Sequence, residues 1–469
     1  MSQYNFSHLK SILPEKFLVS LGGLNGFDKE AFIAVHEKAT AITSIRLNPA
    51  KQLTGNDQWP IKDGRHHSPF TIDSNVPWSS YGYYLAERPS FTLDPLFHAG
   101  SYYVQEASSM FLEQALRQTV DVSKPLKVLD LCAAPGGKST LLQSILSAGS
   151  LLVSNEVIQS RASVLRENMI KWGAANVVVT NNDPKDFQQL QGFFDVIVVD
   201  APCSGSGLFR RDSDAIVEWS ENNVQLCSQR QQRILANALQ ALKADGLLIY
   251  STCSFSAEED ENIIEWLEEE LKIKNVKLEM NEAWNIVESN GGYRFWPDKI
   301  KGEGFFIACF KKIGGMEFSY PRMKAFNKAT KQEAVVLSRY LDNPSQFEFL
   351  PLTDNLFAVP VELVQDVMLL KNLLRIRYAG IEMGVINKDE LIPEHALALS
   401  VHINKTLPAV QLNKEQALHY LRKQDNLQLE LNGLRGWCLM QYEKVNLGWA
   451  KLLPNRINNY YPKEWRILK

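Results

Sequence analysis

Two cysteines each follow closely on a short apolar stretch of the sequence. Residues 194–199 (FDVIVV) and 247–250 (LLIY) have the mostly apolar pattern of strands buried in a parallel sheet, and Cys203 and Cys253 come three or four residues later. Neighbouring strands of such a sheet end at one crevice, so we expect the two sulfur atoms to lie within roughly 10 Å of each other. Two structural thiols in the core are the alternative. That alternative fits poorly, because one cysteine follows a proline and the other lies among hydroxyl residues.

The stretch 126–140 (LKVLDLCAAPGGKST) combines a predicted strand, a tight turn and the start of a helix. Its residues 127–131 are mostly branched and apolar, whereas 138–148 have helical spacing. Two adjacent glycines let the backbone pass close to a ligand, and the first N–H groups of the helix point into the turn. An ordinary strand–helix corner is the alternative. The pattern predicts a ligand-binding turn that contains Cys132, Ala133, Ala134, Pro135, Gly136, Gly137 and Lys138.

Two further apolar stretches follow the turn, and each leads to a carboxylate. Residues 151–155 precede Glu156, and residues 176–180 end near Asp183, with a helix predicted over 158–172 between them. A carboxylate about 20 residues after a glycine-rich turn can accept hydrogen bonds from ribose hydroxyls, and Asp183 could accept one from an adenine amino group. Acids at strand ends are common, so neither residue is diagnostic alone. Together with the turn they indicate an adenosyl cofactor.

The segment before the turn shows no spacing typical of a catalytic site. Helical spacing at 29–40 and a strand pattern at 43–47 indicate a mixed α+β region. Residues 100–116 (GSYYVQEASSMFLEQAL) are predicted to form an amphipathic helix that packs beside the sheet starting at residue 127.

Length and composition restrict the class of protein. At 469 residues, 45% of them apolar, the chain is long enough for about three domains, each with its own core. No apolar run reaches the ~18 residues of a membrane span, and charges interrupt the first twenty residues. The six cysteines contain no CxxC pair, which argues against a zinc site and a disulfide framework. We therefore expect a cytoplasmic monomer with reduced thiols, no metal and no membrane contact.

Positive charge is concentrated near the end of the chain. Residues 401–469 contain 11 Lys or Arg and 5 Asp or Glu, a formal charge of +6 in a chain of net charge −3. A solvated charged surface is the ordinary interpretation. Here, however, the cations alternate with aromatic residues, a mixture that favours phosphate contacts and base stacking. These aromatic residues are Tyr420, Trp437, Tyr442, Trp449, Tyr460, Tyr461 and Trp465.

Several stretches carry the motifs of a known family. LDLCAAPGGKST at 129–140, DAPCSGSGLFRR at 200–211 and YSTCSF at 250–255 closely resemble the cofactor, Pro-Cys and Thr-Cys motifs of the Sun family of RNA cytosine-C5 methyltransferases. The similarity extends to SIRLN at 44–48, VQEASSM at 104–110 and GEGFFIACF at 302–310. After residue 311 the chain resembles bacterial members that act on ribosomal RNA, through 378–400 and a PUA-like ending at 447–466. The paired cysteines are specific, because DNA cytosine methyltransferases use the Pro-Cys cysteine alone.

The resemblance implies an α/β fold with a Rossmann-like, S-adenosylmethionine-dependent methyltransferase core at residues 95–312. It further implies an N-terminal α+β region at 1–94 that could bind RNA. An intermediate α+β domain is expected at 313–400, and a PUA-like RNA-binding domain at 401–469. The expected cofactor is S-adenosylmethionine, bound by the turn, Glu156, Asp183 and Asp200.

The chemistry implied by the resemblance requires two cysteines. C5 of cytosine is a poor nucleophile, so a thiolate first adds to C6 and turns C5 into an enamine carbon that can attack a methyl sulfonium. The resemblance assigns this attack to Cys253 and a role in product release to Cys203. Asp200 is expected to bind the N3/N4 edge of the base, and Lys138 to orient the base or the cofactor carboxylate.

The implied substrate is an unpaired or flipped cytosine of 16S rRNA or the small ribosomal subunit, in the decoding-region helix. A tRNA-directed relative would share every catalytic residue. A ribosome-assembly protein without catalysis would keep the fold, but the presence of Cys203, Cys253 and Asp200 disfavours it. Gly137 and Cys132 depart from the common family pattern, which often has Ser and Ala there, and Cys132 adds a third thiol near the site.

Overall fold

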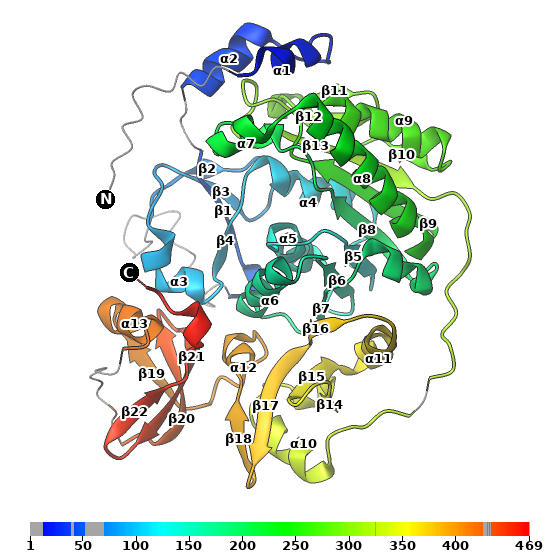
Figure 1. Cartoon of the computed structure of the whole chain (residues 1–469). Helices are drawn as coiled ribbons and strands as arrows, with labels where there is room; N and C mark the ends of the chain where they lie inside the picture. The colour runs from blue at the N-terminus through cyan, green and yellow to red at the C-terminus, as the bar shows by residue number, and fades with distance from the viewer. Residues whose placement is uncertain are drawn as a thin grey trace.

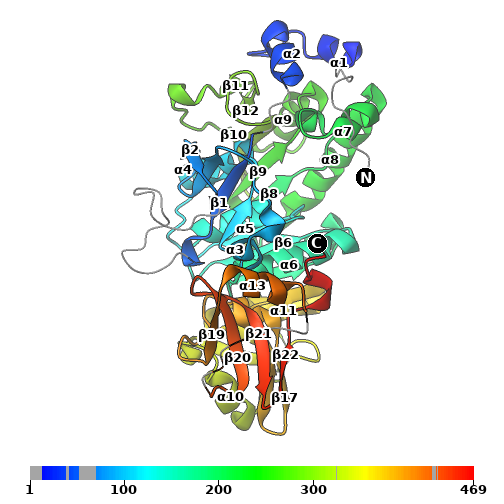
Figure 2. The same cartoon turned by 90° about the vertical axis from the view of Figure 1, so that its left-hand side faces the viewer.

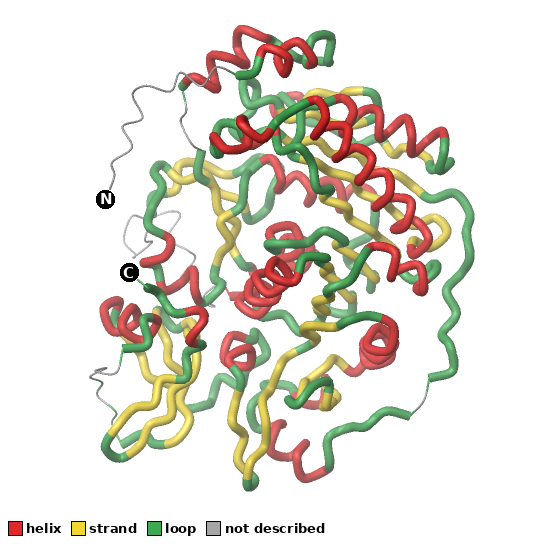
Figure 3. The backbone as a smooth tube through the Cα atoms, in the orientation of Figure 1, coloured by secondary structure: helices red, strands yellow, loops and turns green. Residues whose placement is uncertain are grey.

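A computed structural model describes residues 13–38, 42–51, 70–323, 325–424, 429, 431 and 433–468. Its strands form four sheets, and the largest of them, of ten strands, lies at the centre of the molecule (Figure 1). The smaller sheets come from the N-terminal, middle and C-terminal parts of the chain, and helices surround the strands (Figure 3). None of the described helices is long and apolar enough to cross a membrane.

The central sheet has the strand order β11-β12-β13-β9-β8-β5-β6-β7-β16, with β10 beside β13. Its parallel strands are β5 (Lys127–Asp130), β6 (Leu151–Asn155), β7 (Val177–Thr180), β8 (Phe194–Asp200) and β9 (Leu242–Thr252). These are the strands predicted from the apolar stretches, although β9 begins earlier than residue 247. Antiparallel strands extend one edge: β10 (Lys274–Val276), β11 (Val287–Ser289), β12 (Gly292–Phe295) and β13 (Phe305–Lys311).

The order of the strands creates a switch point beside β5. The chain leaves β5 toward β6 and β7 through α5 (Gly137–Ile145) and α6 (Gln159–Trp172), and then returns to β8 and β9 on the other side. Helix α8 (Glu221–Ala241) joins β8 to β9, and α9 (Glu261–Glu269) follows β9. Ligands of open α/β sheets bind where the strand order reverses, outside the carboxyl ends of the strands. The predicted turn lies at this edge. The loops that follow β8 and β9 and contain Cys203 and Cys253, which we call the cysteine loops, lie there too.

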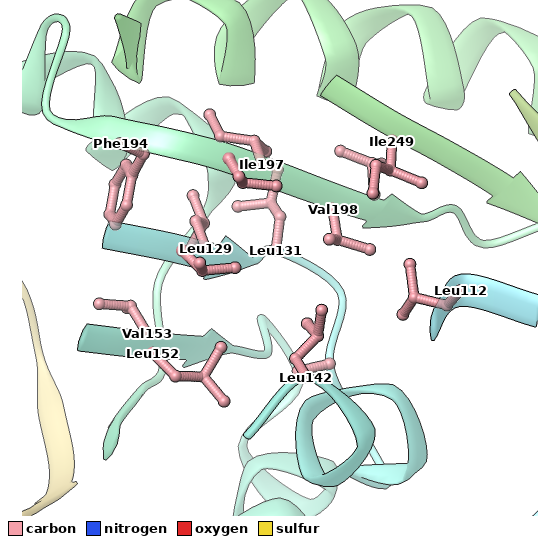
Figure 4. Close-up of a cluster of buried hydrophobic side chains, with 14 of the residues drawn as sticks. Leu112, Leu129, Leu131, Leu142, Leu152, Val153, Phe194, Ile197, Val198 and Ile249 are labelled. Carbon is pink, nitrogen blue, oxygen red and sulfur yellow. The ribbon is translucent and has the colours of Figure 1, made fainter. Parts of the chain in front are cut away.

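The core fills the space between the central sheet and the helices on its two faces (Figure 4). Leu129, Val153, Ile197 and Ile249 come from four adjacent parallel strands, and all are completely buried. Leu142 of α5 packs against this layer. Burying such a side chain stabilises the fold by about 1.5–3 kcal/mol, so the unbroken apolar strands are themselves the reason that this sheet is internal.

The N-terminal sheet differs from the sequence prediction at residues 100–116. Instead of a continuous helix, Tyr102–Val104 forms strand β4, and a 3-10 turn leads into α4 (Leu112–Thr119). Tyr102, Tyr103 and Val104 are aromatic or branched and favour a strand, where they pair antiparallel with β1 (Ser44–Leu47). The sheet is completed by β2 (Ile72–Asn75) and β3 (Gly82–Leu85). It therefore extends beyond residue 94, past the short helix α3 (Pro95–His98).

Two N-terminal helices pack against the cysteine loops rather than against the N-terminal sheet. Helices α1 (Glu15–Ser20) and α2 (Lys29–Glu37) lie at the opposite end of the molecule from the C-terminal sheet (Figure 2). Phe17 and Phe32 are completely buried against Phe209, Phe255 and Trp296, and α7 (Ser213–Glu218) borders this cluster. Phe209 and Phe255 belong to the two cysteine loops, so these helices support the loops from the far side.

The middle part of the chain shares the central core. Its strand β16 (Ile376–Ala379) pairs antiparallel with β7 at the edge of the central sheet, and α11 (Val364–Leu373) packs into the same cluster. The separate middle sheet contains β14 (Phe347–Pro351), β15 (Leu356–Pro360), β17 (Ile381–Asn387) and β18 (Glu390–Pro393), flanked by α10 (Lys331–Ser338) and α12 (His395–Leu399).

The C-terminal sheet corrects the interpretation of the aromatic residues near the end of the chain. It consists of β19 (Ala409–Leu412), β20 (Gly436–Tyr442), β21 (Val445–Leu453) and β22 (Arg456–Asn459), with helix α13 (Lys414–Leu421). Tyr420, Trp437, Trp449 and Tyr461 are buried in its packing, so they are core residues and no platform for stacked bases. Trp437 and Trp449 lie in β20 and β21, Tyr420 lies in α13, and Tyr461 follows β22. Tyr460 is 40% exposed.

Arg46 of β1 joins the N-terminal sheet to α5. Its guanidinium donates to Gln105 Oε1 at 2.8 Å, Thr140 Oγ1 at 2.6 Å and Ser144 Oγ at 3.0 Å, and it lies 4.6 Å from the centre of the Trp172 ring. No described carboxylate lies within ion-pairing distance of it. Burial consequently lowers the pKa of Arg46 to about 9.

Replacing Arg46 with Ala should lower the free energy of unfolding by about 3 kcal/mol, because several hydrogen bonds from a charged donor are lost and buried acceptors are left unpaired. Urea titration followed by tryptophan fluorescence measures this. The exposed Arg88 offers a matched control, and Arg88→Ala should change stability by less than about 0.5 kcal/mol. Equal effects of the two substitutions would contradict the bridging role of Arg46.

Candidate active site

Cys203 and Cys253 lie beyond the ends of β8 and β9. Because Asp200 is opposite Ser251 in the parallel pairing of these strands, the two loops begin at the same level. The two Sγ atoms are 3.1 Å apart, which confirms that they share one crevice. Both residues are partly exposed and unbridged, and we call them the cysteine pair.

The backbones of the two cysteine loops are in direct contact. Gly207 N donates to Cys253 O at 2.8 Å, and Ala201 N donates to Ser251 O at 2.9 Å. A Cβ atom on Gly207 would lie 2.5 Å from Gly304 O and 2.7 Å from Cys253 O, closer than any side chain can be accommodated. Glycine at 207 is therefore what permits the loop after β8 to approach the Thr-Cys loop.

The thiol of Cys203 resists ionisation. The hydrogen bond with Cys253, together with burial, raises the pKa of Cys203 well above the ordinary value of a thiol. The negative charge of Glu259 acts in the same direction. Cys203 therefore keeps its proton at neutral pH and can donate it in a hydrogen bond to the sulfur of Cys253.

Lys138 connects the cysteine pair with the glycine turn. Its ammonium lies 2.8 Å from Asp200 Oδ2 and 5.1 Å from the centre of the Phe305 ring. Burial lowers the pKa of Lys138, but the charge and hydrogen bond of Asp200, followed by the nearby Cys253, outweigh burial and raise it. Ser251 Oγ donates to the other Asp200 oxygen at 2.8 Å. The Lys138 ammonium and the Asp200 carboxyl group are thus fixed in position beside the thiols.

A cleft of about 180 Å³ opens between the glycine turn and the segment after β4. The turn begins α5 through Gly136, whose φ of +115° is in the region that favours glycine. Of the residues predicted to bind a cofactor, those lining the cleft are Cys132, Ala133, Ala134, Pro135, Gly137, Lys138 and Asp200. The opposite wall is formed by residues 103–106 and Ser109. The sequence pattern of residues 100–116 predicts a helix packed beside the sheet and therefore does not indicate this wall.

Glu156 and Asp183 lie at the same edge of the sheet but do not line this cleft. Glu156 is buried, accepts from Ile158 N at 2.9 Å and lies 3.5 Å from the Arg161 guanidinium. Asp183 accepts from Lys185 N at 3.1 Å and caps the 3-10 helix that follows it. Both carboxylates therefore have partners within the chain, and Asp183 has a local structural role.

Asp130, the last residue of β5, is a site residue that sequence reasoning missed. Its Oδ2 accepts from Ser139 Oγ at 2.7 Å, whereas its buried Oδ1 has no hydrogen-bond partner among the described residues. Burial raises the pKa of Asp130 to about 7. Its position at the end of the strand before the glycine turn was the available signal. An unpaired buried acceptor beneath the turn is suited to a donor from a ligand.

Cys132 is distinguished from the cysteine pair by its surroundings. Burial raises its pKa far above the ordinary value, and the nearby negative charges of Asp130 and Glu156 add to this. A thiol that resists ionisation in this way is a poor nucleophile. The structure thus provides no support for catalysis by the third thiol.

A parallel sheet with this switch point, a glycine turn after β5 and acids after β6 and β7 is the architecture of S-adenosylmethionine-dependent methyltransferases. A family model described as 16S rRNA methyltransferase RsmB/F matches residues 118–311. Models for the N-terminal domain of 16S rRNA methyltransferase RsmF and for the methyltransferase RsmF PUA domain match residues 13–107 and 407–467.

Individual relatives agree with these matches along the whole chain. Ribosomal RNA small subunit methyltransferase F of Psychromonas ingrahamii is 30% identical, over 97% of this chain and 98% of its own. The protein of the same name from Shewanella piezotolerans is 29% identical over 93% of both chains. The chain therefore belongs to the family of ribosomal RNA small subunit methyltransferase F, which confirms the resemblance found in its motifs.

A solved structure supports the fold independently. A methyltransferase homolog protein from Pyrococcus horikoshii is 27% identical, with a TM-score of 0.50 over 64% of this chain and 100% of that chain.

Gly207→Ala should reduce methyl transfer by about 10²-fold, because the added Cβ must displace the Cys253 carbonyl and a shift of about 1 Å at a reacting group is that costly. Gly205→Ala is the matched control, since a Cβ there meets nothing within 4 Å and only the φ of +76° is strained. We expect the control to retain activity within about threefold. Initial rates with tritiated cofactor provide the measurement, and similar losses in both variants would contradict the close-approach argument.

Proposed function

We propose that this chain transfers a methyl group from S-adenosylmethionine to C5 of a cytosine in 16S rRNA, in the decoding-region helix of the small ribosomal subunit. The observation that carries the proposal is the cysteine pair, with sulfur atoms 3.1 Å apart beside a lysine–carboxylate pair. The names of the relatives support rRNA as the substrate. C5 of cytosine as the target rests on the paired Pro-Cys and Thr-Cys motifs.

The residues around the glycine turn fit the proposed cofactor. When bound, S-adenosylmethionine would supply an electrophilic methyl group. The cleft is lined by the backbone of residues 132–135, 137 and 138, and the strand that leads into this turn ends at Asp130, whose buried Oδ1 is unpaired among the described residues. Glu156 and Asp183 would accept hydrogen bonds from the ribose and the adenine. These bonds would partly replace the present contacts with Arg161 and Lys185.

Cys253 is the proposed nucleophile, and the electrostatics of the pair support this assignment. The neighbouring Lys138 ammonium interacts electrostatically with Cys253, while Cys203 retains its proton. The Cys253 thiolate adds to C6, so that electron density moves through the ring toward C5. Asp200 would bind the N3/N4 edge of the base in this step, with Lys138 fixing the orientation of the Asp200 carboxylate.

Cys203 is proposed to act in product release. After methyl transfer, a water molecule takes the C5 proton, the electrons of that C–H bond restore the double bond between C5 and C6, and the bond between C6 and the Cys253 sulfur breaks. The Cys203 thiol lies within hydrogen-bonding distance of that sulfur and can stabilise it as a leaving thiolate. This order of events makes the two cysteines unequal: the first is needed to form the adduct, and the second to resolve it.

The proposed RNA contacts include a cavity of about 350 Å³ where the N-terminal, middle and C-terminal parts of the chain meet. Three lysines line it. Lys51 donates to Ala99 O at 2.7 Å and Lys171 O at 2.6 Å, so it serves the internal packing. Lys405 and Lys444 are exposed, and no described carboxylate lies within ion-pairing distance of either. They are therefore available to phosphates.

Cys253→Ala should abolish methylation and form no covalent RNA complex, because no adduct can start. Cys203→Ala should accumulate an RNA-linked protein that survives denaturing gel electrophoresis, and the double variant should not. Cys132→Ala should behave almost like the wild type. Bisulfite sequencing of rRNA and tRNA from cells expressing each variant identifies the methylated base.

If Cys253→Ala, and not Cys203→Ala, accumulates the RNA-linked protein, the roles of the two cysteines must be exchanged. A bisulfite signal confined to tRNA would mean that tRNA, and not rRNA, is the substrate. Absence of both the trapped complex and any signal would favour a binding protein without catalysis.

The double variant Lys405→Glu/Lys444→Glu should weaken RNA binding and reduce the slope of log affinity against log salt by about 1.5, since each phosphate contact contributes about 0.7–0.9. Substitution is preferable to truncation at residue 401, which would uncover the core around Trp449. Lys29→Glu/Lys331→Glu changes the net charge equally at two exposed helix starts and should leave the slope unchanged. Filter binding at several salt concentrations distinguishes local contacts from a net-charge effect.

A further inference from the structure

Glu259 is a completely buried acid that contacts both cysteine loops. It ends the 3-10 turn Ala257–Glu259 after β9. One carboxylate oxygen accepts from Ser204 N at 2.8 Å and Gln231 Nε2 at 3.2 Å. The other accepts from Ser254 Oγ at 2.7 Å and from the Ser204 hydroxyl. Four donors thus surround one carboxylate.

The serines bound by Glu259 are the immediate neighbours of the cysteine pair. Ser204 follows Cys203, and Ser254 follows Cys253. A single carboxylate is therefore attached to both loops at a distance of one residue from each sulfur. The loops also touch through Gly207 N and Cys253 O, and through Phe255 N, which donates to Ser206 Oγ at 2.9 Å. Of these links, the one through Glu259 involves residues adjacent to both cysteines.

The position of Glu259 is itself fixed from the other side. Tyr250 OH donates to Glu259 O at 2.6 Å and to Gln231 Oε1 at 3.0 Å, and Gln231 in turn donates to the carboxylate. Arg294 pairs with Asp260 and Glu261 instead, and no described cation lies within ion-pairing distance of Glu259. The acid is thus held by neutral donors, in a network that contains no exposed member.

The donors around Glu259 stabilise its ionised form. Burial is the larger effect and raises the pKa of Glu259, while hydrogen bonds from Ser204, Ser254 and Gln231 oppose that rise. A carboxylate accepts all four bonds, and its charge shortens and strengthens them. Glutamine at this position keeps the volume, but its NH₂ group either faces the donor Ser204 N or reverses the bonds with the two serine hydroxyls, and the remaining links become neutral, weaker and longer.

We propose that Glu259 is a positioning residue that sets the separation of Cys203 and Cys253. This inference rests on the proposed function, in which the Cys203 thiol must reach the Cys253 sulfur as it leaves the base. Glu259 touches neither base nor cofactor and acts through Ser204 and Ser254. The distance between the two sulfurs depends on one carboxylate that accepts from both loops.

The test compares Glu259→Gln with Glu258→Gln in the full-length protein. Glu258 is the adjacent acid, and its side chain is partly exposed. Glu259→Gln should lower kcat by about 30–100-fold, as expected for misplacement of a reacting group, and leave KM for RNA and the Kd of the cofactor within about twofold. Glu258→Gln should match the wild type in all three. A merely destabilising substitution would lower the active fraction without trapping RNA, whereas Glu259→Gln should retain an RNA-linked species as release slows.

A second readout reports the separation directly and needs no catalysis. Diamide oxidises two nearby thiols to one disulfide and is itself reduced to the hydrazine, taking up two electrons and two protons. The rate of formation of the Cys203–Cys253 disulfide, followed by peptide mapping, should fall at least fivefold in Glu259→Gln and remain unchanged in Glu258→Gln. If Glu259→Gln does not fold, Ser204→Ala and Ser254→Ala each remove one link and should each lower this rate.

A wild-type disulfide rate and kcat in Glu259→Gln would overturn the inference. The same holds for unchanged disulfide rates in both serine variants. If the wild type itself methylates no cytosine but the disulfide rate falls as expected, the proposed function fails and the positioning role stands. The two failures are therefore distinguishable.

Discussion

The parallel hydrogen bonding of β8, with β5 on one side and β9 on the other, determines where every side chain of the site lies. Asp130 is opposite Val198 and Asp200 is opposite Ser251, so β8 and β9 end within one residue of each other and β5 ends two residues earlier. Side chains alternate between the faces of a sheet, and a slip of one residue would turn Asp200 away from Lys138. The apolar strands fix this register, because any other pairing would expose part of the core. The chemistry of the site thus depends on packing that contains no chemically active residue.

The site is acidic, and this shapes the behaviour of its thiols. Asp130, Asp200, Glu156 and Glu259 all lie close to the switch point. Burial, with negative charge as the smaller cause, raises the pKa of Cys132, and the hydrogen bond with Cys253 together with burial raises that of Cys203. Lys138 supplies a cation in these surroundings, and Asp200 keeps it charged despite its burial. The ion pair therefore places a fixed positive charge beside the cysteine pair.

The sequence was sufficient for the parallel strands, because each is a short, almost unbroken apolar stretch followed by polar residues. It was also sufficient for the proximity of Cys203 and Cys253, which follows from strand adjacency alone. It was insufficient where contacts with distant parts of the chain determine the local structure. Tyr102–Val104 becomes a strand only because β1 is there to pair with it, and Glu259 acquires its significance only when two distant serines fold onto it. The buried aromatic residues of the C-terminal part were misjudged for the same reason, since their burial depends on the elements that pack against them.

The N-terminal part of the chain also belongs to the mechanical support of the site. Helices α1 and α2 pack Phe17 and Phe32 against Phe255, the residue after Ser254, while Arg46 contacts α5 at the base of the glycine turn. Ser108 Oγ donates to Glu303 O at 2.8 Å, next to Gly304, whose carbonyl faces Gly207. Each element of the cleft and of the cysteine pair is thus backed by a segment from before residue 110. The cysteine loops therefore obtain part of their rigidity from the N-terminal region.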